Sequence, residues 1–169
     1  MPLYRLMLED HRDVFPVSLG QVQAAIQKMA SSTGPTFLNL KDGDGNWAQA
    51  GGTDGRYLVD ARDVYGEGFR HCMAALPGCT DRTKTVVYYR NRCTENEHAP
   101  RKCPLNATVA DVLSLKDVMA ILTEYWATGL RSATYGWDDV SQDWIDKEAA
   151  DLGAGIKIIT PKPKPGLAE

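Results

Sequence analysis

The sequence predicts an α+β domain in which two principal amphipathic helices pack on an antiparallel sheet of four to six strands. Three observations lead to this fold class. Apolar residues recur at helical spacing in two separate segments, short β-branched or aromatic runs lie between them, and tight Gly- and Asp-rich turns join the runs. The chain has 169 residues, of which 43% are hydrophobic and 24% charged, and this is enough for one globular core.

The first helix is predicted after a short strand at residues 4–9 and a turn around Pro16. Ser18 and Gln21 have the spacing of a capping box, which satisfies backbone N–H groups at a helix start. The helix is expected to end within residues 31–35, where a glycine is followed by a proline. The side chains expected to face the core are Val22, Ala25, Ile26 and Met29.

Further strands are expected in short apolar runs bounded by turn residues. These runs are residues 36–40, 47–50, 56–60 and 83–89, while residues 69–76 fit either a strand or a helix. Residues 90–107 are polar and contain two prolines, so we interpret them as an excursion from the sheet. Residues 109–112 are expected to form a short strand.

The second helix is predicted from its N-cap Ser114 to Gly129. Its apolar stripe is expected to consist of Leu115, Val118, Met119, Leu122 and Trp126. A final strand is expected at residues 134–140, and a helix of low apolar content at residues 141–150. The sequence thus predicts one globular domain over residues 1–152 and a mobile tail with Pro and Lys over residues 153–169.

Charge and hydropathy narrow the class of partner. No apolar run is long enough for a signal-peptide core or a membrane helix, so we expect a cytoplasmic protein that contacts no membrane. The net charge is −3 and the chain has no dense block of Lys and Arg, which argues against nucleic acid as the partner. A mildly acidic surface would instead suit a basic protein partner.

The cysteines and histidines offer an alternative function, a small metal- or ligand-binding module. The residues concerned are Cys72, Cys79, Cys93, His98 and Cys103, with His71 next to the first. Their spacing lacks the paired knuckle of a structural zinc site, so no metal or other cofactor is expected. A disulfide between Cys93 and Cys103 is geometrically reasonable, but a reducing compartment favours four thiols.

Residues Asp42, Asp44 and Asn46 alternate like the start of a calcium loop. The places that such a loop needs for Gly and for a bidentate acid are occupied by Trp47 and Thr53. A solvated hairpin turn is therefore the prediction for this segment.

We do not expect the chain to be an enzyme. It contains no Gly-rich nucleophile elbow, no H-E-x-x-H and no phosphate loop. Convergence of Cys72 or His71 with a carboxylate in space is the one catalytic arrangement that the sequence leaves open.

A protein-binding surface is predicted near the C-terminal end of the domain. Residues 137–144 hold two tryptophans and three carboxylates, and aromatic anchors beside acids suit a protein interface. The proposed contact residues are Asp138, Asp139, Asp143 and Trp144, with Asp42 and Asp44 of the hairpin turn as a second set. The alternative for this segment is that Trp137 belongs to the core and the acids are merely solvated.

The order of elements resembles immunity protein family 1 of bacterial polymorphic toxin systems. The resemblance spans residues 18–140 and is carried by Ser18-Leu19-Gly20-Gln21, Phe37-Leu38-Asn39-Leu40, Val112-Leu113-Ser114-Leu115-Lys116-Asp117, Glu124-Tyr125-Trp126-Ala127-Thr128-Gly129, Leu130-Arg131-Ser132 and Tyr135-Gly136-Trp137. It implies an α+β fold and a stoichiometric inhibitor without catalytic residues. The expected partner is a cognate toxin domain, such as a nuclease or a deaminase. The resemblance leaves the toxin and the oligomeric state open.

Overall fold

The computed structural model describes residues 3–9, 13–66, 68–91, 101–143 and 145–146. The strands are β1 (Arg5–Leu8), β2 (Asp13–Val14), β3 (Phe37–Lys41), β4 (Trp47–Thr53), β5 (Arg56–Tyr65), β6 (Gly68–Ala75), β7 (Lys84–Asn91), β8 (Arg101–Thr108) and β9 (Gly136–Asp139). The helices are α1 (Leu19–Met29), the 3₁₀-helix η1 (Val109–Asp111) and α2 (Leu115–Thr128).

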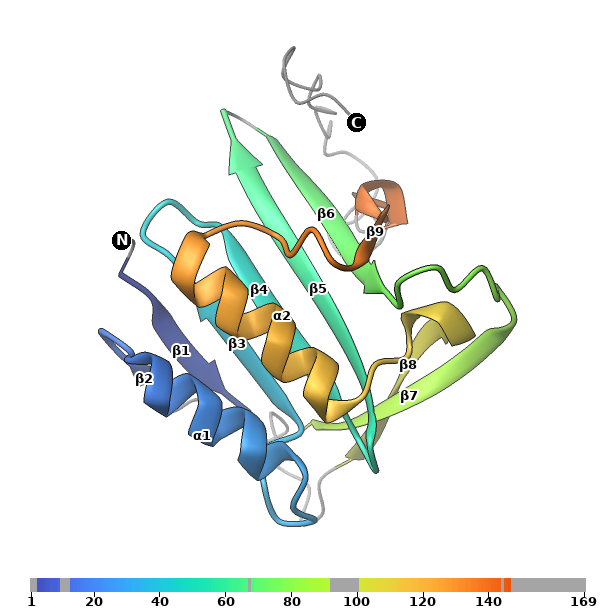
Figure 1. Ribbon diagram of the computed structural model, residues 1–169, viewed down its shortest axis with the longest axis horizontal. Helices are drawn as coiled ribbons and strands as arrows, with labels where there is room; N and C mark the ends of the chain where they lie inside the picture. Colours follow the sequence, from blue (N-terminus) through green and yellow to red (C-terminus); the bar gives the residue numbers. More distant parts are fainter. Residues whose placement is uncertain (1–2, 10–12, 67, 92–100, 144, 147–169) are drawn as a thin grey trace.

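The predicted fold class is confirmed. An antiparallel sheet of seven strands, in the order β2-β1-β3-β4-β5-β6-β9, carries α1 and α2 side by side on one face (Figure 1). Its strand number exceeds the expected four to six because the two-residue edge strand β2 forms where a turn was expected, whereas the other edge strand, β9, lies within the strand predicted at residues 134–140. Residues 69–76, which fitted either element, lie mostly in β6.

Helix α1 forms as the sequence predicts. Ser18 and Gln21 make the reciprocal hydrogen bonds of a capping box, and the four predicted core side chains Val22, Ala25, Ile26 and Met29 are buried. Lys28 lies in the last turn, where a cation interacts favourably with the C-terminal end of the helix dipole.

Helix α2 also begins and ends where expected, but its buried face is rotated from the predicted stripe. Ser114 and Asp117 form the capping box, and Gly129 closes the helix at φ 73° in the left-handed region. The buried side chains are Val118, Ile121, Leu122 and Tyr125. The predicted stripe members Leu115, Met119 and Trp126 are only partly buried.

The hydrophobic core lies between the helices and one face of the sheet. Successive side chains along a strand point to opposite faces of the sheet, and residues paired directly across neighbouring strands share a face. On β4, β5 and β6 the partners Ala48, Ala61 and Cys72 point toward the helices, and all three are buried. Small alanines in the central strands allow the helices to approach the sheet closely.

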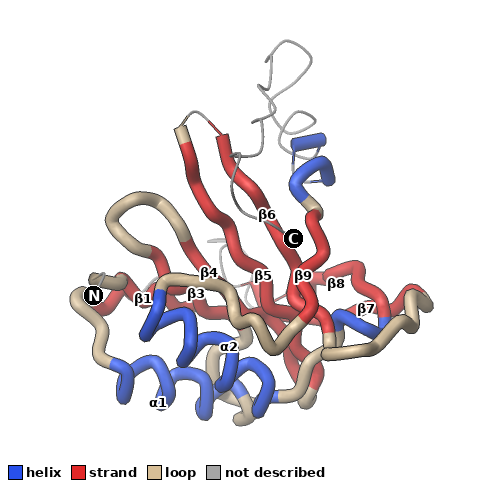
Figure 2. Tube along the Cα trace, turned by 45° about the horizontal axis from the view of Figure 1, so that its top comes forward, coloured by secondary structure: helices blue, strands red, loops and turns tan. Residues whose placement is uncertain are grey.

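Strands β7 and β8 form a separate two-stranded arm that packs on the other face of the sheet. Thr53 Oγ1 donates to the Tyr88 carbonyl at 3.1 Å, Arg56 donates to Thr85 Oγ1 at 2.7 Å, and Leu105 lies against Gly51. Figure 2 shows the arm beside the lower end of β5 and β6.

The arm corrects two predictions. Residues 101–107 are part of β8 rather than an irregular excursion, and Pro104 is tolerated because an edge strand leaves one side of its backbone unpaired. Residues 109–111 form a 3₁₀ turn rather than a strand, because the Asp111 carboxylate caps Thr108 N at 2.7 Å. Residues 92–100 lie outside the described part of the chain.

The C-terminal end of the domain is described only in part. Residues 141–143 and 145–146 are helical, in line with the predicted start at Ser141. The predicted tail at residues 153–169 lies outside the described residues. Over the residues described, no helix has the length and apolar character needed to cross a membrane.

Candidate binding surface at the hairpin end of the sheet

One row of residues crosses β4, β5 and β6 near one end of the sheet and continues in the residue after β9. Trp47 of β4 pairs with Arg62 of β5, and Arg62 pairs with His71 of β6. On the other side of β6, Val140 N donates to the His71 carbonyl at 2.9 Å. The turn between β3 and β4 and the segment after β9 therefore leave the sheet at the same end, on the two sides of the long β5–β6 hairpin (Figures 1 and 2).

We call this region the hairpin end; it comprises residues 42–46, residues 63–66 with 68–70, and residues 138–143. It brings together both acidic segments that the sequence singled out. Three to four strand spacings separate them, which is on the order of 15–20 Å. A standard protein interface covers about 800 Å² on each partner, so one partner could touch both segments.

In the first segment, Asp42 has a structural task. Its Oδ1 accepts from the backbone N–H groups of Asp44 and Asn46 at 2.9 Å each, and its Oδ2 accepts from Asn46 Nδ2 at 2.8 Å. Asn46 Oδ1 in turn accepts from Val64 N at 2.7 Å, which ties the turn to β5. The predicted hairpin turn is confirmed, and its one exposed carboxylate is Asp44.

In the second segment, Asp138 and Asp139 are paired with arginines of this chain. Arg82 reaches Asp138 at 2.5 Å, and Arg70 Nε donates to Asp139 at 3.0 Å. Ser141 also donates to Asp139 through its backbone N–H at 3.0 Å and its hydroxyl at 2.6 Å. Partial burial raises the pKa of Asp139, but the bonds from Ser141 and Arg70 outweigh it, so the pKa lies below its ordinary value.

Two of the six predicted contact residues thus present carboxylates without an ion pair inside the described chain and are also exposed: Asp44 and Asp143. Trp144 lies outside the described residues. Trp137 packs partly buried against the core and donates from Nε1 to the Ser132 carbonyl at 2.9 Å. The pairing of each acid thus depends on residues distant in sequence, and the role of these six residues as contact residues stays a prediction.

Beneath the hairpin end lies a buried polar network that the sequence did not reveal. His71 Nε2 and Asp60 Oδ2 are 2.7 Å apart, and Gln49 Nε2 donates to the same Asp60 oxygen at 3.0 Å. Asn39 donates to Gln49 at 3.3 Å and extends the chain of hydrogen bonds. His71 is fully buried and Asp60 nearly so. The members of this network come from four different strands, so no local sequence pattern marks them.

Arg62 closes this network from the outside. Its Nε donates to His71 Nδ1 at 3.4 Å, and its guanidinium lies 4.0 Å from the ring centroid of Phe69 and 5.4 Å from that of Trp47. Because arginine only donates hydrogen bonds, Nδ1 of His71 is the acceptor. We therefore assign the ring proton to Nε2, which donates a hydrogen bond to Asp60. Both ring nitrogens are engaged, so the arrangement favours rigid support of the hairpin over proton transfer to a substrate.

His71 and Cys72 cannot act together because adjacent residues of a strand face opposite sides of the sheet. Cys72 is fully buried on the helix side, where Arg131 Nη1 lies 2.8 Å from its sulfur. Burial raises the pKa of the Cys72 thiol, although Arg131 and Arg70 oppose the shift. A buried thiol of this kind is typical of a structural cysteine.

The alternative of a metal module gains no support from the described ranges. No three His, Cys, Asp or Glu side chains gather there in a way that could hold a metal ion. Cys79 lies in the loop after β6, and Cys103 lies in β8. Cys93 and His98, and with them the suggested disulfide, lie outside the described residues.

Comparison with known proteins does not extend this description. The chain matches no family model, no curated protein and no solved structure.

Proposed function

We propose that this chain is an immunity protein that binds a cognate bacterial toxin domain and covers its active site. The observation that carries the proposal is the meeting of both predicted acidic segments at the hairpin end, on either side of a hairpin held by a buried network. The sequence resemblance to an immunity family supports the same function. In this function the chain acts as a stoichiometric inhibitor and catalyses no reaction of its own.

The mechanism is steric and electrostatic. A nuclease or nucleotide-directed toxin needs cationic side chains around its substrate, and the exposed carboxylates of Asp44 and Asp143 would face them. Complementary charge would speed the encounter, and the projecting hairpin would exclude substrate. Affinity would then depend mainly on slow dissociation.

The Asp60–His71–Arg62 network serves this function by preorganisation. It joins β5 to β6 through side chains in addition to their backbone ladder. A rigid hairpin loses little conformational freedom on binding, which favours tight association.

The direct test is to express the product of the neighbouring gene in bacteria, to establish that it is toxic, and to ask whether this chain protects the cells. Co-expression of this chain is expected to restore growth, and the two proteins are expected to co-purify in equimolar amounts. If the toxin kills cells equally with and without this chain, and the purified proteins do not associate, the proposed function is wrong. The metal-module alternative predicts instead that purified protein carries stoichiometric metal by elemental analysis.

A further inference from the structure

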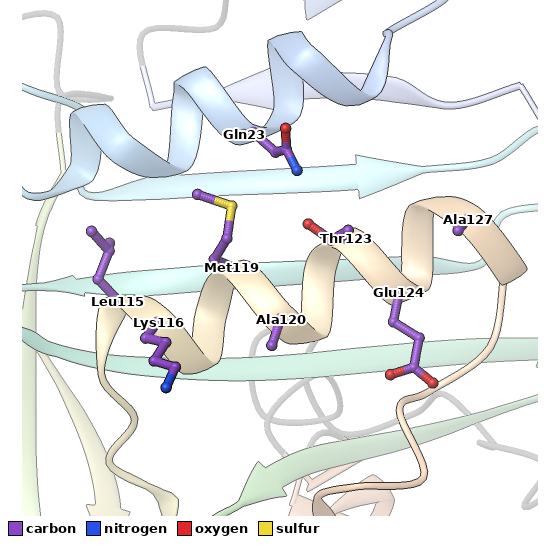
Figure 3. Close-up of a pocket in the computed structure, with 8 residues that line it drawn as sticks. All are labelled: Gln23, Leu115, Lys116, Met119, Ala120, Thr123, Glu124 and Ala127. Atoms are coloured by element: carbon purple, nitrogen blue, oxygen red, sulfur yellow. The ribbon is translucent and has the colours of Figure 1, made fainter.

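The surface of α2 that turns away from the core borders an open groove of about 690 Å³ (Figure 3). Two rows of side chains run along it at intervals of four residues. One row, Leu115, Met119, Thr123 and Ala127, points toward α1, where Gln23 faces it. The other row, Lys116, Ala120 and Glu124, forms the outer rim. Apolar and small side chains therefore make up most of the walls.

The outer rim is self-complementary in charge. Lys116 and Glu124 stand four residues before and four residues after Ala120, and neither forms an ion pair within the described chain. They are about 12 Å apart along the helix axis, since each residue adds about 1.5 Å. A second copy of α2 laid antiparallel, with the symmetry axis at Ala120, brings each lysine opposite the other copy's glutamate. The same operation makes both ion pairs at once.

The side chain at the centre suits this arrangement. Ala120 is exposed and small, so two helices can approach there to the 8–10 Å that packed helices require. Met119 is flexible enough to fit the neighbouring surface, and the groove beside it can receive side chains of the second helix. Two-fold contacts in which the same patch meets itself are the commonest interfaces of soluble homo-oligomers.

We propose that the groove along α2 is a homodimer interface in which Lys116 and Glu124 of one copy pair with Glu124 and Lys116 of the other. It shares no residue with the hairpin end, so it stands independently of the proposed toxin binding. A dimer would carry two hairpin ends and could bind two toxin domains.

The test is the sedimentation equilibrium of the full chain over a concentration series, at low and high salt. Wild-type protein is expected to dimerise, and Lys116→Glu or Glu124→Lys alone is expected to raise the dimer dissociation constant by about tenfold or more, because like charges then face each other. The double variant Lys116→Glu with Glu124→Lys is expected to restore dimerisation. Lys84→Glu on exposed β7 is the matched charge-reversal control and is expected to dimerise as wild type does.

Ala120→Arg provides a second, steric probe and is expected to yield monomers with an unchanged circular dichroism spectrum. A wild-type protein that stays monomeric at all concentrations would overturn the proposal, and so would a dimer that none of these variants weakens. If wild-type protein is monomeric and Ala120→Arg abolishes its binding to the toxin, the proposal is also overturned, and the groove is assigned to the toxin.

Discussion

Asp60 and His71 face each other at 2.7 Å across neighbouring strands, on the side of the sheet that turns away from both helices. The pair has the composition of a catalytic dyad, yet Arg62 occupies the second ring nitrogen and the imidazole is fully buried. Its place at the base of the projecting β5–β6 hairpin gives it a mechanical role.

Replacement of His71 tests that role. We expect His71→Phe to lower the free energy of unfolding by about 2–4 kcal/mol, because it leaves the Asp60 carboxylate buried with fewer partners. Urea denaturation followed by circular dichroism measures the change. Gln49→Leu removes a bond to the same oxygen and is expected to cost less, about 1 kcal/mol. A loss below about 0.5 kcal/mol for His71→Phe would show that the network does not support the hairpin.

Trp126 provides a test of the helix-sheet packing. Its ring packs partly buried against the core, and its Nε1 donates to the Val17 carbonyl at 3.1 Å. We expect Trp126→Ala to destabilise the fold by about 3 kcal/mol, at the low end for a large aromatic because the ring is only partly buried. Trp126→Phe keeps most of the apolar area and is expected to cost about 1 kcal/mol for the lost hydrogen bond. Equal losses of folding free energy in Trp126→Ala and Trp126→Phe would show that the apolar area of the ring does not account for most of its contribution.

The Asp117 carboxylate makes stability depend on acid pH. Partial burial raises its pKa, but bonds from the Ser114 hydroxyl and backbone N–H and from Tyr135 outweigh this, so the pKa lies below the ordinary 3.8. The unfolded chain therefore binds a proton first, and stability is lost as the pH falls below about 4 through the folded-state pKa. We expect Asp117→Asn to be less stable than wild type at pH 7 and to lose less on acidification. If the urea midpoints of wild type and Asp117→Asn fall by the same amount between pH 7 and pH 3, the role assigned to Asp117 is wrong.

Charge reversal at the C-terminal acids separates two kinds of carboxylate. Asp139→Lys places a cation beside Arg70 and removes the acceptor of two hydrogen bonds from Ser141, so it is expected to cost about 1–2 kcal/mol. Asp143→Lys disturbs no ion pair within the described chain and is expected to change stability by less than about 0.5 kcal/mol. Thermal unfolding of the two variants beside wild type checks the difference. A larger loss at Asp143 would mean that its carboxylate has a structural partner.

The fold was predictable where local signals decide it. The capping box at Ser18 and the N-cap at Ser114 marked the two helix starts, and turn residues at 42–46 marked the first hairpin. The rotation of the α2 face was not predictable, since Tyr125 and Trp126 are neighbours of similar character and tertiary packing chose Tyr125 for the core. Strand β8 was missed because Pro104 and polar alternation are typical of loops as well as of edge strands.

The candidate site was predictable only in location. Both acidic segments were visible as sequence patterns, but their meeting at one end of the sheet depends on the strand order. The arginines that pair with Asp138 and Asp139 come from 56 and 69 residues away, and local sequence carries no information on such contacts. The Asp60–His71 pair depends on register in the same way.

The proposed function requires this chain to bind a toxin domain through the hairpin end. Titration calorimetry of the product of the neighbouring gene against wild type, Asp44→Asn, Asp143→Asn and the control Asp54→Asn tests this binding. Asp54 lies in the β4–β5 turn at the opposite end of the sheet. Asn removes the charge and keeps the size and turn preference of Asp. We expect an equimolar complex that Asp44→Asn and Asp143→Asn each weaken by about tenfold, with a smaller effect at high salt, and that Asp54→Asn leaves unchanged. Equal affinity of all four proteins would contradict the proposed surface, and no binding by wild type would contradict the proposed function.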